Sequence, residues 1–110
     1  MKTISREELK AKLDRGDDFK LVMTLGEWAY QAKHIPGSIN INRPQDAESL
    51  LQKDDEIVVY CSDPTCISSQ AAYHIMVSKG FTNVRRYSGG LADWEAAGLP
   101  LEGSLVEERD

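Results

Sequence analysis

The run Ile57-Val58-Val59-Tyr60 constrains the fold more than any other part of the chain. All four residues are β-branched or aromatic, which is typical of a strand. Because polar and apolar residues do not alternate in the run, we expect both faces of this strand to be buried. Strands of this kind lie near the centre of parallel sheets that are covered by helices. The run therefore predicts a central, parallel strand, and Cys61 follows it directly.

Helical and strand-like segments alternate along the rest of the chain. At the N-terminus, Ser5 and Glu8 have the spacing of a capping box, which predicts the start of a helix. Gly16 is a stop signal that predicts its end. The expected helices are 6–15, 27–32, 45–52, 68–79 and 91–97, and the expected strands are 20–24, 38–41, 57–60 and 84–87. This alternation predicts an α/β fold with a mostly parallel sheet.

Length and composition are those of one domain. The chain has 110 residues, of which 41% are apolar, and a chain of this size can bury a core without disulfide or metal staples. There is no internal repeat and no linker, so we interpret 1–110 as a single domain. The polar C-terminal stretch from about 104 to 110 is expected to fray.

The charge balance argues against two classes of partner. Lys and Arg number 13 and Asp and Glu number 18, which gives a net charge of −5. Nucleic acids and anionic membrane surfaces both require clustered positive charge, so we expect neither as a partner. No apolar run approaches the roughly 20 residues of a membrane helix. The N-terminus lacks the hydrophobic region of a secretory signal, and we expect a cytoplasmic protein.

Cys61 stands where chemistry is expected in such a fold. Ligands of open α/β sheets bind beyond the carboxyl ends of the strands. Cys61 ends the strand 57–60 and opens a loop into the helix expected at 68–79. A helix N-terminus stabilises a thiolate, the reactive form of cysteine, so this position suits a nucleophile. The alternative from position alone is a small apolar residue buried at a strand end.

Several motifs, in this order and at this spacing, resemble the rhodanese-like domain family. They are His34-Ile35-Pro36-Gly37-Ser38-Ile39-Asn40, Ile57-Val58-Val59-Tyr60-Cys61, Ala71-Ala72, Lys79-Gly80-Phe81-Thr82-Asn83-Val84, Tyr87-Ser88-Gly89-Gly90-Leu91-Ala92-Asp93-Trp94 and Ala97-Gly98-Leu99-Pro100. The resemblance implies a single α/β domain with a five-stranded, mostly parallel sheet and helices on both faces.

The resemblance also implies an activity, which is sulfur transfer. Cys61 would accept a sulfane sulfur, become a persulfide and pass the sulfur to a thiol or to cyanide. The partners implied are a small sulfur donor and a thiol acceptor, and a protein partner remains open. The loop after Cys61 would wrap the sulfur with backbone N–H groups. No metal or organic cofactor is implied.

The active-site loop departs from the family pattern. It comprises Ser62, Asp63, Pro64, Thr65, Cys66 and Ile67 and leads to Ser68. Family members that use thiosulfate usually carry basic residues and glycine here. This loop has no Arg or Lys, Asp63 adds negative charge and Pro64 lacks an N–H group. We therefore expect weak use of thiosulfate. Phosphatases and arsenate reductases of related fold need Arg six residues after the cysteine, where this chain has Ile67, so oxyanion chemistry is not expected.

Cys66 has three interpretations. It could attack a persulfide on Cys61, releasing sulfide and leaving a disulfide, or it could take the sulfur and relay it. It could also be a buried spectator in the first turn of the following helix. The alternative function for the whole domain is therefore a non-catalytic or redox-switch binding module that uses a Cys61–Cys66 disulfide.

The remaining candidate residues have structural interpretations. Ser68 and Ser69 are expected to cap the helix that follows the loop. Trp28 and Trp94 are expected to be core or helix-packing residues and not ligand platforms. Gly89-Gly90 is expected to meet a backbone requirement near the active loop.

The histidines are not expected to bind metal. His34 is interpreted as structural, and His74 falls within the helix expected at 68–79. Together with Cys61 and Cys66 they have the ligand types of a zinc site, but their spacing matches no common pattern.

Overall fold

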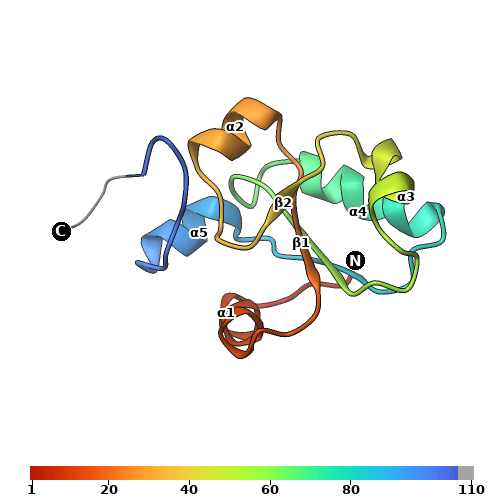
Figure 1. The fold of residues 1–110 in the computed structure, drawn as a ribbon, viewed down its shortest axis with the longest axis horizontal. Coiled ribbons are helices and arrows are strands. Elements are labelled where there is room, and N and C mark those ends of the chain that lie inside the picture. The colour runs from red at the N-terminus through yellow and green to blue at the C-terminus, as the bar shows by residue number, and fades with distance from the viewer. Residues whose placement is uncertain (107–110) are drawn as a thin grey trace.

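A computed structural model describes residues 1–106 of the chain (Figure 1). Helices and strands alternate, as the sequence predicts. In chain order the elements are α1 (Arg6–Arg15), β1 (Lys20–Met23), α2 (Glu27–Ala32), β2 (Ile39–Asn40), the 3₁₀ helix η1 (Pro44–Asp46), α3 (Ala47–Leu50), β3 (Ile57–Tyr60), α4 (Ser68–Ser78), β4 (Val84–Arg86) and α5 (Gly90–Ala96).

The sheet has the strand order β2-β1-β3-β4, and all its pairings are parallel. The prediction that β3 is an interior, parallel strand is confirmed, because all four of its residues are buried. Within residues 1–106 the sheet has four strands, not the five that the resemblance implies. In place of a fifth strand, Thr3 forms a single parallel bridge with Arg86 at the outer edge of β4. The extended segment before α1 is too short to continue this ladder.

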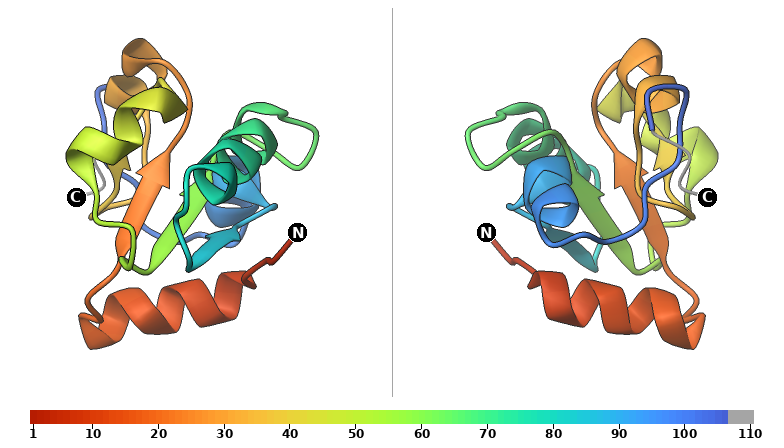
Figure 2. Two further views of the ribbon diagram at one scale, coloured as in Figure 1. Left: turned by 90° about the vertical axis from the view of Figure 1, so that its right-hand side faces the viewer. Right: turned by 90° about the vertical axis from the view of Figure 1, so that its left-hand side faces the viewer.

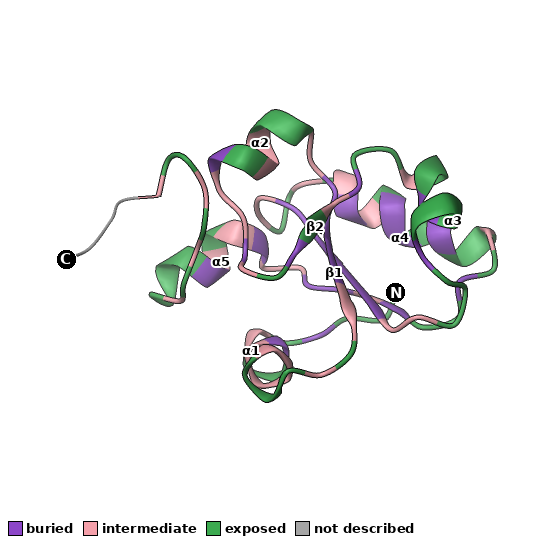
Figure 3. Ribbon diagram, viewed as in Figure 1, coloured by how far each residue is buried: buried purple, intermediate pink, exposed green. Residues whose placement is uncertain are grey.

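The two faces of the sheet bury two separate clusters, as the twofold alternation of strand side chains requires. One cluster joins Val58 and Tyr60 of β3 to Leu9 of α1 and Trp94 of α5. The other joins Ile57 and Val59 of β3 to residues of α3 and α4, and these are Ala47, Tyr73 and Met76. The expected helices on both faces are therefore present. Figure 3 shows the interior of the sheet buried, whereas much of the outer surface of the helices is exposed.

The segment expected as one helix over 45–52 is divided. Pro44 stands in the first turn of η1, and α3 follows with only four residues. The sequence predicts that this helix packs through both Leu50 and Leu51. Leu51 is buried, but Leu50 is 60% exposed, so the prediction is wrong for Leu50. Ala47 supplies the second buried contact. A short helix turns only a narrow face toward the core, and Leu50 lies outside that face.

The ends of the chain differ from expectation in two details. Ser5 caps α1 by accepting the N–H of Glu8, but the Glu8 carboxylate pairs with Arg85 and does not complete the capping box. The tail expected to fray from 104 is held at its start. The N–H groups of Ser104 and Leu105 donate to main-chain carbonyls of α2 at 3.0 Å. Residues 107–110 lie outside the described part of the chain.

The carboxyl ends of the parallel strands meet at one edge of the sheet. Figure 2 shows the loop after β3 at this edge, on the same side as α2 and opposite α1. Cys61 therefore lies at the edge where the sequence places ligand binding. No helix within residues 1–106 has the length and apolar character needed to cross a membrane.

Candidate active site around Cys61

Cys61 is buried at the carboxyl end of β3, and only 1% of the residue is exposed. Its neighbour Tyr60 points to the face that α1 and α5 cover, so alternation turns Cys61 toward α4. The Cys61 sulfur lies 3.5 Å from the hydroxyl oxygen of Ser69 in the first turn of α4. The predicted arrangement of strand, cysteine, loop and helix start is therefore present.

Cys61 and Cys66 are joined by a disulfide. Their Cα atoms are 6.5 Å apart, within the range that disulfides span. The loop therefore brings the Cys66 sulfur to the candidate nucleophile. The choice among a resolving, a relay and a spectator role for Cys66 stays a prediction. Cys66 is only partly buried, whereas Cys61 is enclosed. The disulfide closes a ring that contains residues 62–65 of the expected active-site loop.

Asp63 organises the loop through its own carboxylate. One carboxylate oxygen accepts the N–H of Thr65 at 2.9 Å and the Thr65 hydroxyl at 2.6 Å. Hydrogen bonding from Thr65 lowers the pKa of the Asp63 carboxyl, and the Cys66 N–H makes a smaller contribution in the same direction. The Cys66 N–H also donates to the main-chain carbonyl of Asp63 at 3.2 Å. The N–H groups of Thr65 and Cys66 are thus engaged within the loop, and Pro64 has none. The expected wrapping of sulfur by loop N–H groups is not available from these three positions in this oxidised form.

The N-terminal end of α5 holds the other side of the loop. The N–H of Leu91 donates to the Cys61 carbonyl at 2.9 Å, and the N–H of Ala92 donates to the Ser62 carbonyl at 2.8 Å. Gly90 has a φ of +65°, and a Cβ atom there would stand 2.5 Å from the Cys61 carbonyl oxygen. The backbone requirement expected for the Gly-Gly pair is confirmed at Gly90.

Arg86 is the functional candidate that the sequence analysis missed. Its side chain extends from β4 behind the loop, and only 7% of the residue is exposed. The Nε–H donates to the Ser69 hydroxyl oxygen at 2.8 Å, and Nη2 donates to the carbonyls of Pro64 and Cys66 at 3.3 and 3.4 Å. A signal was present in the sequence, because strand alternation puts Arg86 on the same face as the apolar Val84.

The expected capping role of Ser68 and Ser69 is wrong. The residue at the cap position of α4 is Ile67, and no side chain caps this helix end. Ser69 is fully buried, and its hydroxyl meets Arg86 and Cys61 instead of the helix backbone. Ile67, which stands where phosphatases and arsenate reductases of related fold have their arginine, is 75% exposed. The loop therefore offers no side-chain cation on its outer surface.

The other candidates lie away from Cys61 or in structural positions. His34 stacks on Tyr30 with ring centroids 4.0 Å apart, and its Nδ1 lies 2.7 Å from the Tyr30 carbonyl oxygen. Trp94 is buried as expected, but Trp28 is 79% exposed, so the expectation of a core or helix-packing position is wrong for Trp28. No group of three or more His, Cys, Asp or Glu side chains within residues 1–106 is arranged to hold a metal ion.

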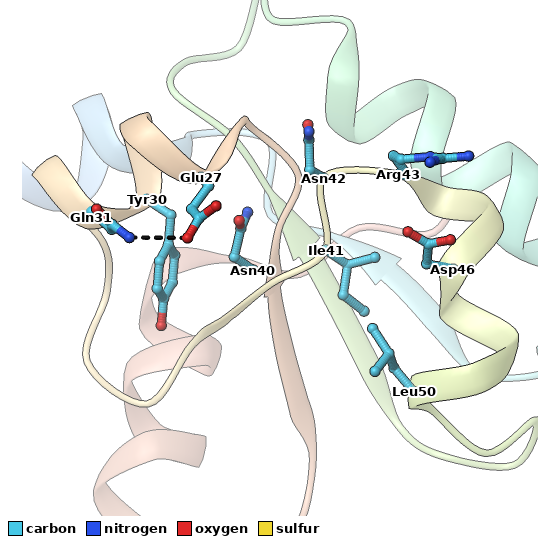
Figure 4. A pocket seen from close by; sticks show the side chains of 9 residues that line it. All are labelled: Glu27, Tyr30, Gln31, Asn40, Ile41, Asn42, Arg43, Asp46 and Leu50. Atoms are coloured by element: carbon cyan, nitrogen blue, oxygen red, sulfur yellow. Dashed lines mark hydrogen bonds between the residues drawn. The ribbon is translucent and has the colours of Figure 1, made fainter.

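A hollow of about 450 Å³ opens at the same edge of the sheet, but without residues of the Cys61 loop. Side chains of α2 and β2 line it on one side and those of η1 and α3 on the other (Figure 4). Tyr30 and Asn40 contribute to the first side, and Asp46 and Leu50 to the second. Gln31 donates to Glu27 on its rim at 3.1 Å. The Cys61 sulfur is thus enclosed by the loop and not exposed in this hollow.

A comparison with known protein families shows to which family the chain belongs. The model of the rhodanese-like domain matches residues 5–97. The chain belongs to the rhodanese-like domain family. The resemblance that the sequence motifs indicated is therefore confirmed.

Two kinds of relative resemble this rhodanese-like domain in sequence. The chain is 37% identical over 110 residues to the HTH-type transcriptional regulator Rv0324 of Mycobacterium tuberculosis, with 97% of this chain and 48% of the regulator covered. It therefore spans about half of that relative. It is 38% identical over 71 residues to the thiosulfate sulfurtransferase GlpE of Pseudoalteromonas translucida, with 63% of this chain and 66% of GlpE covered. For GlpE of Pseudomonas savastanoi pv. phaseolicola the identity is 30% over 97 residues, which cover 86% of this chain and 88% of GlpE.

Solved structures agree with the family assignment. The BH2092 protein of Bacillus halodurans superposes with a TM-score of 0.86 at 26% identity, over 94% of this chain and 78% of that one. The rhodanese-like domain of the Anabaena Alr3790 protein superposes with a TM-score of 0.83 at 29% identity, over 100% of this chain and 89% of that one. The α/β domain with a parallel sheet is therefore the shared fold.

Proposed function

We propose that this domain is a sulfurtransferase in which Cys61 carries sulfane sulfur as a persulfide. The observation that carries the proposal is the position of the Cys61 sulfur, at the carboxyl end of β3 and 3.5 Å from the Ser69 hydroxyl at the start of α4. The electrostatic field of a helix N-terminus favours a thiolate. The GlpE relatives, named as thiosulfate sulfurtransferases, support the reaction class.

The reaction proceeds in two displacements. The reduced Cys61 thiolate attacks the sulfane sulfur of a donor persulfide, R–S–SH, so that a new sulfur–sulfur bond forms on Cys61 and the thiol R–SH leaves. An acceptor thiolate then attacks the terminal sulfur, becomes a persulfide itself and restores the Cys61 thiolate. Both steps are thiol–disulfide-type exchanges, so their rates depend on the thiolate fraction of the attacking sulfur.

The loop favours persulfides or polysulfides over thiosulfate as donors. The hydrogen bonds from Thr65 lower the pKa of Asp63, which keeps its carboxylate ionised at neutral pH. A dianion approaching the loop from outside therefore meets a negative charge and no cationic side chain of the loop. Arg86 lies behind the loop, with its donors directed to Ser69 and to loop carbonyls. Steady-state kinetics with thiosulfate and with a low-molecular-weight persulfide test this preference, and a higher kcat/KM with thiosulfate would contradict it.

The disulfide favours a second candidate, in which the domain is a redox switch. In the oxidised form Cys61 has no free thiol, so it cannot accept a sulfane sulfur. One route to this form starts from the persulfide, in which the Cys66 thiolate attacks the inner sulfur on Cys61. The Cys61–Cys66 bond forms and hydrosulfide leaves. The likeness to a transcriptional regulator is compatible with such signalling, because a domain of this kind could report sulfur species to a protein partner.

Intact mass spectrometry separates the two candidates. The reduced protein is treated with a low-molecular-weight persulfide, and the mass is followed with time. A sulfurtransferase gains one sulfur that a thiol acceptor removes. A resolving Cys66 instead gives loss of two hydrogens and release of sulfide, without added thiol.

Two variants complete this experiment. Cys61→Ser is expected to abolish sulfur uptake, and Cys66→Ser is expected to retain a stable persulfide on Cys61. Uptake by the Cys61→Ser protein at the wild-type rate would refute the assignment of the nucleophile. A stable wild-type persulfide with Cys66 still open to alkylation would refute the resolving role.

A further inference from the structure

Arg86 is a buried cation without a buried anion. Within residues 1–106 no carboxylate lies within ion-pair distance of its guanidinium, although 12 such contacts occur elsewhere in this part of the chain. A buried charge is costly unless an opposite charge or several hydrogen bonds compensate it. Arg86 has only the Ser69 hydroxyl and two carbonyls. Its surroundings therefore suit an anion that forms nearby.

The hydrogen bonds from Arg86 give the Ser69 hydroxyl a direction. The Arg86 Nε–H can only donate, so Ser69 Oγ accepts at 2.8 Å. The hydroxyl proton of Ser69 is then free to point to its other partner, the Cys61 sulfur at 3.5 Å. Ser69 is fully buried, so water does not compete for this proton. Arg86 thus donates to Ser69, and Ser69 donates to the Cys61 sulfur.

We propose that Arg86, acting through the Ser69 hydroxyl, is the positioning residue that stabilises negative charge on the Cys61 sulfur in the thiolate and in the persulfide. This rests on the proposed function for the persulfide but not for the thiolate. Hydrogen bonds to an ionised acceptor are stronger than neutral ones, and a buried site increases that difference. The basic residue absent from the loop is therefore supplied from β4, behind the sulfur.

The other charged groups near Cys61 do not take this role. The Asp63 carboxylate accepts from Thr65 within the loop. The first turn of α4 contains no acidic residue. On α5, Asp93 pairs with Arg6 at 2.9 Å and accepts the Tyr87 hydroxyl at 2.5 Å. Arg86 is the charged group that these contacts link to the sulfur.

The test measures the pKa of Cys61 without any sulfur donor. In the full chain carrying Cys66→Ser, Cys61 is the one thiol, and the pH dependence of its alkylation by iodoacetamide reports its pKa. Ser69→Ala is expected to raise this pKa by about one unit, roughly a tenfold lower thiolate fraction at pH values below it. Arg86→Gln is expected to raise it at least as much. The double variant should add little to Arg86→Gln, because both changes break the same series of hydrogen bonds.

Matched controls lie beside each residue. Arg85→Gln removes the same charge from the same strand, but Arg85 pairs with Glu8 and Glu56 on the opposite face. Ser68→Ala removes a hydroxyl from the same helix turn. Both controls should leave the pKa of Cys61 unchanged. If Ser69→Ala and Arg86→Gln also leave it unchanged, the proposal is wrong.

Two further outcomes are decisive. A raised pKa in Arg86→Gln with an unaltered pKa in Ser69→Ala would overturn the role of Ser69 as the link. If Arg86→Gln does not fold, Ser69→Ala tests the same series of hydrogen bonds with the loss of a single oxygen atom. Arg86→Lys tests whether a positive charge alone keeps the pKa of Cys61 at its wild-type value. Alkylation requires no sulfur transfer, so this test is independent of the proposed function. If the sulfurtransferase assignment is wrong, the protein will take up no sulfur, but the variants will still differ in the pKa of Cys61.

Discussion

The loop that begins at Cys61 is held from two sides in different ways. On the α5 side the contacts are between main chains, from the N–H groups of Leu91 and Ala92 to the loop carbonyls, with Gly90 packed against them. On the side of α4 and β4 the contacts come from polar side chains, those of Ser69 and Arg86. The first set determines where the loop backbone lies, and the second reaches the sulfur itself.

The main-chain contacts on the α5 side and the side-chain contacts on the α4 and β4 side are expected to affect different properties of the domain. Main-chain contacts depend on shape, so residues on the α5 side should affect the free energy of unfolding. Side-chain donors on the α4 side act on the charge of the sulfur, so their loss should affect ionisation and redox equilibria. Three substitutions test this division, from the largest expected effect to the smallest.

Gly90→Ala should destabilise the domain most. The new Cβ would stand 2.5 Å from the Cys61 carbonyl oxygen and 2.9 Å from main-chain atoms of Ser62 and Asp63, at a φ of +65°. We expect the free energy of unfolding to fall by about 3 kcal/mol, from left-handed strain and from displacement of the loop. Chemical denaturation measures this value.

Gly98→Ala is the matched control for that prediction. Gly98 follows the same helix with a φ of +73°, but nothing lies within 4 Å of its added Cβ. It should lose only the conformational part, about 1–2 kcal/mol. Equal losses in both variants would show that contact with the loop does not contribute.

Tyr60→Phe should have an intermediate effect that depends on pH. The Tyr60 hydroxyl accepts the N–H of Ile35 at 3.0 Å and lies 2.9 Å from the Ser38 hydroxyl. Its loss leaves a buried donor unpaired, so we expect a loss of about 1–2 kcal/mol at neutral pH. The pKa of Cys61 should change little, because Tyr60 points to the opposite face.

The pH dependence of this variant has a definite sign. Burial raises the pKa of Tyr60 to about 12, against hydrogen bonds from Ser38 and Ile35 that lower it. A folded pKa above the unfolded value of about 10 means that the contribution is complete below pH 10. It is lost as the pH rises through about 12. The difference in unfolding free energy between wild type and Tyr60→Phe should therefore shrink in alkali, and a constant difference would contradict this account.

Arg86→Gln should change the Cys61–Cys66 redox equilibrium while Arg85→Gln does not. Arg86 stabilises the thiolate of the reduced form, whereas the disulfide has no anion for it to stabilise. Removal of Arg86 should make the disulfide harder to reduce, and the reduction potential should fall by about 30 mV if the thiolate loses a factor of ten. Equilibration with a glutathione buffer, followed by alkylation and mass spectrometry, measures this potential. An unchanged or higher potential would place Arg86 among purely structural residues.

The sequence by itself determined the fold class and the position of the candidate nucleophile, Cys61. The apolar run from Ile57 to Tyr60 encodes burial on both faces, and this is a local property that needs no partner to be recognised. The same run places Cys61 at the edge of the sheet where ligands bind, and the family motifs favour a nucleophile there over a buried apolar residue. The match of element order to the family motifs extended this prediction over nearly the whole chain.

Only the tertiary structure decided what surrounds the sulfur. Ser69 and Arg86 lie eight and 25 positions beyond Cys61 in the chain, and the packing of α4 and β4 brings them together. From the sequence, Ser69 is expected to cap a helix, and strand alternation places Arg86 only on the same face as Val84. Local pattern does not show which side chains the loop after Cys61 will contact. The same holds for Trp28 and Leu50, which are apolar but exposed, since their short helices turn them away from the core. Local sequence encodes the elements, whereas the contacts that tune the chemistry of Cys61 exist only after these elements pack.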